Sequence, residues 1–346
     1  MTKLTLEQID LVSELRYQTT IANRNNVTRT AAYLRFYLAH PEVDWALLAH
    51  LVSRNGGWNM TDLRGEWLPR IMSEEEIESF FLFLERSNWL IFHDAYPQLL
   101  LYAEAKKQGE DLFHLLPSLG VSRFMVPLWQ QFWQKREPRP LTHGLIINEQ
   151  QYIQQRVVRQ PYFQRRVLET FKFQAQSLLS LNQVLFPYKQ HPTDATFSIV
   201  GTVVHHFPLV EKRIEVGKAL YRLLFGNRDR LEKIIAWAKR IPHTGSRADY
   251  WPHIFSPYQK SSNQNYQARL NGTRLLPGRA KLYSPRLTDV WPEIDHPPAD
   301  GVDWYREQKW IDLLEESSVL PCLDTDDYAV SLHHVDHGMQ WLDKLT

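Results

Sequence analysis

Residues 41–57 read PEVDWALLAHLVSRNGG, and this stretch predicts the helical character of the chain. Pro41 stands where the first turn of a helix tolerates a missing backbone N–H. The double glycine Gly56-Gly57 follows, and glycine commonly ends a helix in the left-handed conformation. Between them, apolar residues recur at the three- and four-residue spacing of one helical face: Trp45, Leu48, Ala49 and Val52. We therefore predict an amphipathic helix that ends at the double glycine.

Helix start signals lie on both sides of this stretch. Thr5 with Gln8 and Ser73 with Glu76 form capping boxes, in which a hydroxyl and a Glu or Gln side chain satisfy free backbone N–H groups reciprocally. Asn26 is placed to cap a second helix that ends near residue 39. The first quarter of the chain is thus expected to be a series of helices.

The helical pattern continues towards the C-terminus, with breaks expected at Pro97, Gly109, Pro117, Pro127 and Pro138. We expect further helices over residues 61–68, 162–185, 208–225, 227–240, 304–316 and 331–345. Residues 195–207 are the best candidate for extended structure, because they are rich in Thr, Val, Ile and Phe.

Residues 241–300 have a different composition, crowded with Pro, Gly, Asn and Ser. A loop of this length is unusual within a compact domain. It contains many aromatic rings, which we expect to hold it against the helices. The fold class is therefore predicted to be all-α: one multi-helix globular domain over residues 1–346. It would comprise a helical body over 1–240, a long irregular, aromatic-rich C-terminal segment over 241–300 and helices over 301–346.

The composition excludes several classes of protein. Hydrophobic residues make up 43% of the chain and charged residues 23%, which is typical of a folded protein and not of a disordered one. The single cysteine, Cys322, excludes an internal disulfide and a thiolate-rich metal site. Residues 2–15 lack the apolar region of a signal peptide, and no apolar stretch is long enough to span a bilayer. We therefore expect a soluble, cytoplasmic protein.

The charges are unevenly distributed although the net charge is only +1. Residues 239–286 contain nine Lys or Arg and one acidic residue, whereas residues 287–346 contain three basic and fourteen acidic residues. The two segments are expected to dock on each other or on the body. The alternative is a basic segment that binds the phosphates of a nucleic acid.

Two polar stretches are candidates for a ligand site: RNNVTRT over residues 24–30 and SRNGGWNMTD over residues 53–62. Both are expected at helix ends, where free backbone groups and Arg side chains can surround an anion. The same residues are also ordinary capping and loop-bonding residues, so an architectural interpretation stays open. The candidate ligand-binding residues are Arg24, Asn25, Thr28, Arg29, Arg54, Asn55, Trp58, Asn59 and Asp62.

A third polar stretch, TGSRADYWP over residues 244–252, adds Arg247, Asp249 and Trp251 to the candidates. Its small residues, its Arg/Asp pair and its rings are compatible with a loop that contacts a phosphate or a substrate. The alternative is a structured loop in which Arg247 and Asp249 satisfy each other.

Metal-site patterns are weak, and no metal site is predicted. His93-Asp94 is similar to the adjacent doublet of helical metal phosphohydrolases, but the sequence fixes no second pair beside it. His333 and His337 are one helical turn apart without an obvious third ligand. No phosphate-binding loop, nucleophile elbow, zinc-protease helix or dinucleotide fingerprint occurs in the sequence.

Residues 24–62, together with GKALYRLLFG over 217–226 and GSRADYWPHIF over 245–255, resemble the YppC-like family of uncharacterised Firmicutes proteins. The resemblance covers most of the chain. It implies a bacterial protein that is not secreted. It carries over no catalytic residue and no cofactor, because that family is one of unknown function.

Three functional hypotheses follow. The first is a binding or scaffold protein that holds a small anionic or polar ligand near Arg24, Arg29, Arg54 and Asn55, with Arg247 as a further contact. The second is a phosphate-directed hydrolase or transferase that uses the same pocket. The third, less favoured, is a nucleic-acid accessory protein that binds through residues 239–286.

Overall fold

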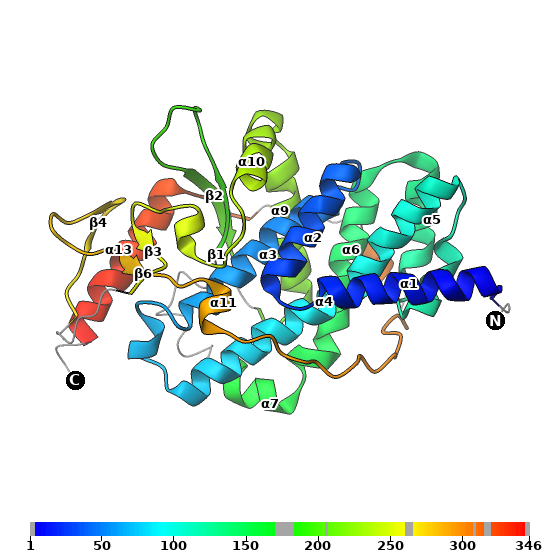
Figure 1. Cartoon of the computed structure of the whole chain (residues 1–346), viewed down its shortest axis with the longest axis horizontal. Helices are drawn as coiled ribbons and strands as arrows, with labels where there is room; N and C mark the ends of the chain where they lie inside the picture. The colour runs from blue at the N-terminus through cyan, green and yellow to red at the C-terminus, as the bar shows by residue number, and fades with distance from the viewer. Residues whose placement is uncertain are drawn as a thin grey trace.

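The computed structural model describes residues 4–169, 183–204, 207–259, 266–306, 309–314 and 320–342. Within these ranges the protein is mostly helical (Figure 1). The N-terminal helices are α1 (Leu6–Ala22), α2 (Asn26–Ala39), α3 (Asp44–Asp62), α4 (Glu74–Gln108), α5 (Met125–Lys135), α6 (Pro138–Ile153) and α7 (Pro161–Phe163). They are followed by α9 (Val210–Phe225), α10 (Arg228–Arg240), α11 (Leu287–Val290), α12 (Lys309–Asp312) and α13 (Thr325–Leu342).

The helices pack around α3, which contacts α2, α4, α6 and α9. Of the predicted apolar face, Trp45 and Leu48 are buried in the core, whereas Ala49 is partly exposed and Val52 is 38% exposed. Helix α6 packs in turn against α4, α5 and α9. Figure 1 shows α1 and α5 at one end of the molecule and α13 at the other, with α3 and α4 between them.

The described residues also form small sheets that an all-α class does not include. Strands β1 (Gln183–Tyr188), β2 (Ser198–Val203) and β7 (Leu323–Asp324) form an antiparallel sheet in the order β1-β2-β7. Strand β3 (Phe255–Ser256) pairs in parallel with β6 (Leu282–Tyr283), and β4 (Leu270–Asn271) pairs with β5 (Arg274–Leu275). The expected extended segment over 195–207 is confirmed in β2.

The prediction that a helix ends at Gly56-Gly57 is wrong, because α3 runs through both glycines to Asp62. A Cβ atom on Gly57 would lie 2.3 Å from the Asn26 amide oxygen and 2.4 Å from the His243 ring nitrogen. This glycine is therefore required for close packing and not for a turn. The separate helix expected over residues 61–68 does not form: α3 ends at Asp62, and a short 3-10 helix begins only at Leu68 and ends at Arg70.

The cap signals and the helix breakers were each confirmed in part. The capping boxes of Thr5 and Ser73 are confirmed, and Gly109 ends α4 in the left-handed conformation. The cap of α2 is Asn25, whose amide oxygen accepts from the Thr28 N–H, and not Asn26. Pro97 does not break α4, since the helix packs along its length against α1, α2 and α6.

The expected helix over 162–185 does not reach its predicted end. Short helical turns cover Pro161–Phe163 and Gln164–Leu168, and strand β1 already begins at Gln183. Residues 170–182 lie outside the described residues. Of the two closing helices, α12 is shorter than expected and α13 begins earlier, at Thr325.

The segment over 241–300 contributes several rings to the core. Tyr250, Trp251 and Phe255 are buried, whereas Tyr258 is exposed. Trp291 stacks on Phe81 of α4, with their ring centroids 3.9 Å apart. The acidic segment over 287–346 contacts both the helical body and the basic segment over 239–286. Asp303 pairs with Arg123 of the body, and Asp336 accepts hydrogen bonds from the backbone N–H groups of Arg269 and Leu270 in the basic segment.

Candidate functional site

Arg29 is 1% exposed and lies on the face of α2 that points towards α4. Its guanidinium forms an ion pair with Glu85 and donates to the Asn23 amide oxygen over 3.2 Å. Its Nε–H has no hydrogen-bond partner among the described residues. The positive charge of Arg29 is therefore balanced by Glu85, but its Nε–H donor remains without an acceptor among the described residues.

Arg54 is equally buried but has a different set of partners. Its Nε donates to His50 over 3.0 Å, and another nitrogen donates to the carbonyls of Ala238 and Ile241. The guanidinium lies 4.3 Å from the Trp237 ring centroid. Burial lowers the pKa of Arg54 to about 10, although the Asp249 carboxylate acts in the opposite direction. Arg54 thus joins α3 to the end of α10.

Arg247 and Asp62 form a two-pronged ion pair, with nitrogen–oxygen distances of 2.6–3.0 Å. The same guanidinium donates to the hydroxyls of Tyr250 and Tyr328, which lie far apart in the sequence. Burial acts against the charge of Arg247, but Asp62 and the two tyrosines outweigh it and raise the pKa of Arg247. This pair connects α3, the 247–250 loop and α13.

The loop pairing expected between Arg247 and Asp249 does not form, because Asp249 has other partners. It accepts hydrogen bonds from the backbone and hydroxyl of Thr244 and lies 3.5 Å from the His243 ring. His243 contacts Asn26, which in turn donates to Ser53. The three polar stretches of the sequence therefore meet around His243, through Asn26, Ser53 and Asp249.

Arg24, Asn25 and Thr28 lie at the start of α2. Arg24 is exposed and 3.6 Å from Glu293, and the Asn25 amide also donates to Glu293. A cavity of about 220 Å³ beside them is lined by Glu85 and Glu293 as well as by Asn25. Since carboxylates already stand there, an anion would meet repulsion.

Of the remaining candidate residues, some are buried in the core and others line a second cavity. Trp58 and Trp251 are buried, and the Trp251 indole donates to the Phe197 carbonyl. The Asn55 side chain exchanges two hydrogen bonds with the backbone of Leu185, which fixes the edge of β1 onto α3. Asn55, Asn59 and Arg29 also line a second cavity, in the centre of the helices.

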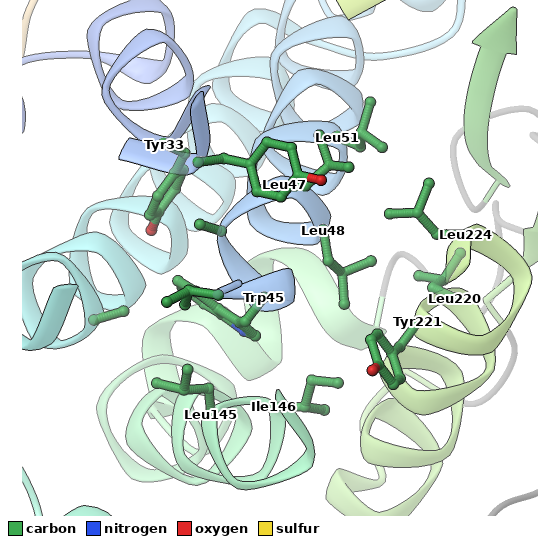
Figure 2. Packing of buried hydrophobic residues seen from close by; sticks show 14 of the residues in the cluster. Tyr33, Trp45, Leu47, Leu48, Leu51, Leu145, Ile146, Leu220, Tyr221 and Leu224 are labelled. Atoms are coloured by element: carbon green, nitrogen blue, oxygen red, sulfur yellow. The ribbon is translucent and has the colours of Figure 1, made fainter. Parts of the chain in front are cut away.

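This central cavity has a volume of about 270 Å³ and lies between α3, α4, α6 and α9. Figure 2 shows Leu48, Ile146 and Leu220 projecting from α3, α6 and α9 towards the same region. The lining is mainly apolar and includes Trp45, Leu48, Val52, Phe80, Phe83, Leu84, Ile91, Ile146, Val204, Phe207, Val216 and Leu220.

A few polar groups interrupt the apolar wall of the central cavity. Glu149 of α6 is one of them, and burial raises its pKa to about 8, so that its neutral form is favoured at neutral pH. Tyr33 and Gln183 also line the cavity, and the Tyr33 hydroxyl and the Gln183 amide oxygen have no hydrogen-bond partner among the described residues. Arg213 is satisfied by Gln150, Gln154 and the Phe207 carbonyl.

The family model described as "Protein of unknown function (DUF2515)" matches residues 21–319 of the chain. The chain belongs to this family. It is also 36% identical, over 340 residues, to the "Uncharacterized protein YppC" of Bacillus subtilis (strain 168), an alignment that spans 96% of this chain and 97% of the relative. The predicted YppC-like family is therefore confirmed. No solved structure matches the chain.

Two features are absent from the described ranges. None of the helices in them is long and apolar enough to cross a membrane. In the same ranges no three His, Cys, Asp or Glu residues are grouped as metal ligands, although the rings of His333 and His337 lie 4.1 Å apart.

The sequence reasoning missed Tyr33 and Glu149 as candidate residues. A signal was present for each of them. Tyr33 follows Arg29 by four residues, which places both on one face of α2. Glu149 is the one charged residue in the otherwise apolar and amide-rich run LIINEQQYI over 145–153, which suggests a carboxyl group inside the protein.

Proposed function

We propose that this protein binds a small, mainly apolar molecule in the central cavity between α3, α4, α6 and α9. The observation that carries the proposal is the cavity itself, which has large apolar side chains on every helix around it and a mainly apolar surface. Binding pockets for small molecules typically combine such a wall with a small number of polar groups that fix orientation. At about 30 Å³ per water-sized atom, about nine non-hydrogen atoms fit.

The proposal keeps the predicted class of a binding protein but changes its ligand. An anion at the predicted arginines would compete with Glu85 at Arg29, with Asp62 at Arg247 and with backbone carbonyls at Arg54. Among the predicted residues, the proposal therefore uses Arg29, Asn55 and Asn59, which line the cavity. No described contact favours the hydrolase or the nucleic-acid hypothesis over it. The single-domain organisation and the cytoplasmic location are retained as parts of the proposal.

Cumene, a compact hydrocarbon of about this size, is a suitable first probe. We expect it to bind to the purified protein in an isothermal titration and to raise the melting temperature, because a ligand stabilises the folded state that binds it. Val52→Trp should abolish this binding, since Val52 lines the cavity and a larger ring would occupy it.

The matched control is Val330→Trp on α13. Val330 is also a half-exposed helical valine, and it does not line the cavity. Cumene binding that is absent from the unmodified protein, or that survives Val52→Trp unchanged, would disprove the proposal.

A further inference from the structure

One wall of the central cavity contains two unused hydrogen-bond donors on the same helix. Arg29 and Tyr33 are one turn apart on α2, both line the cavity, and they are 1% and 3% exposed. The Arg29 Nε–H and the Tyr33 hydroxyl have no partner among the described residues. Buried donors are nearly always paired, and an unpaired one costs about 1–3 kcal/mol. Two such donors one helical turn apart, on residues that line the same cavity, indicate a place for an acceptor atom of a ligand.

The surroundings of these donors disfavour a charged ligand group. The positive charge of Arg29 is already matched by Glu85. Glu149 of α6 and Asp94 of α4 face Tyr33, and burial raises the pKa of Glu149 to about 8 and that of Asp94 to about 7. A ligand carboxylate would add a negative charge beside these two carboxyl groups. A ligand ammonium would lie next to the Arg29 guanidinium.

We propose that the ligand of this cavity is an uncharged molecule with one carbonyl oxygen, which accepts hydrogen bonds from the Tyr33 hydroxyl and the Arg29 Nε–H. Its apolar body lies against the cavity walls formed by Leu48, Ile146 and Leu220. This inference rests on the proposed function, since it names the class of ligand for the same cavity.

Four probes of equal size separate the ligand classes: acetophenone, cumene, benzoate and 1-phenylethylamine. They share a phenyl ring and carry a carbonyl, a purely apolar, an anionic and a cationic group respectively. We expect acetophenone to bind about tenfold more tightly than cumene, because only its oxygen satisfies the two donors. Benzoate and the amine should bind more weakly than acetophenone.

Tyr33→Phe tests the assignment to this helix. The variant removes an unpaired hydroxyl and should fold as well as the unmodified protein. It should lose most of the preference for acetophenone over cumene, while cumene binding is retained. Tyr37→Phe is the control, since Tyr37 is a buried tyrosine of the same helix that does not line the cavity, and it should keep the preference.

The outcomes distinguish this inference from the proposed function. If cumene binds but acetophenone binds no better, or if the preference survives Tyr33→Phe, the inference is wrong and the apolar binding function stands. If benzoate or the amine binds most tightly, the ligand is charged and the inference is also wrong. If none of the four probes binds, both are wrong.

Discussion

Arg29, Arg54 and Arg247 show how the same residue type takes different roles according to its neighbours. Arg247 and Asp62 satisfy each other almost entirely, and Arg54 is bonded to carbonyls and a ring. Arg29 and Arg54 each retain a nitrogen without a hydrogen-bond partner among the described residues, and of the two only Arg29 lines the central cavity. An arginine in a polar stretch is therefore informative only when its partners are known.

Asp62→Ala should destabilise the protein by about 3 kcal/mol. The change leaves the buried Arg247 guanidinium without its carboxylate, and breaking a buried pair is costly in this way. Urea denaturation measures the free energy of unfolding. Asp229→Ala, which removes an exposed pair with Lys233, is the control and should change it by less than about 0.5 kcal/mol. Equal effects of the two changes would contradict the architectural role of Asp62.

Glu149→Gln should stabilise the protein at alkaline pH. The unfolded chain releases this proton near the ordinary value of 4.5, whereas the folded protein holds it to a pKa of about 8. The folded state therefore loses stability as the pH rises between these values, by at most about 5 kcal/mol. The neighbours of Glu149 are Tyr33 of α2, Trp45 of α3, Asp94 of α4 and Gln150.

Thermal unfolding of the Glu149→Gln variant between pH 4.5 and 9 measures this difference. The two proteins should melt alike near pH 4.5, and the variant should melt later as the pH rises. The exposed Glu211→Gln change is the control and should show no such divergence. A variant that melts earlier at pH 8 would show that the carboxylate is stabilised in the folded protein.

At the scale of the elements, sequence reasoning succeeded where a signal is local. The capping boxes at Thr5 and Ser73 depend on residues three positions apart, so the sequence alone could show them. The double glycine misled because its role depends on Asn26 and on His243, which is almost two hundred residues away. The helix break predicted at Pro97 is wrong for the same reason, because α4 packs against other helices and continues through this residue.

Gly57→Ala tests this account of α3. Alanine normally stabilises a helix interior relative to glycine by about 1 kcal/mol. At this position the new methyl group would lie 2.3 Å from Asn26 and 2.4 Å from His243, so we expect a loss of at least about 1 kcal/mol. Gly338→Ala in α13 is the control, because no atom lies within 4 Å of the added carbon, and it should gain stability. Stabilisation by both changes would contradict the packing role of Gly57.

For the molecule as a whole, the sequence predicted a mostly helical protein of the YppC-like family but not its cavity. The cavity wall combines α3, α4, α6 and α9, whose side chains become neighbours only when the helices pack. No local pattern marks such a space. The candidate residues Arg29, Asn55 and Asn59 were reached from their polar character, and their position beside an apolar cavity could not be inferred.

The most direct test of the central claim is a crystal structure of the protein under xenon pressure. An apolar cavity takes up xenon, whereas a polar one holds ordered water. We predict a xenon atom between Leu48, Ile146 and Leu220, and none there in a Val52→Trp crystal. Ordered water molecules throughout this space, or protein side chains that fill it, would contradict the proposal that the protein binds an apolar ligand.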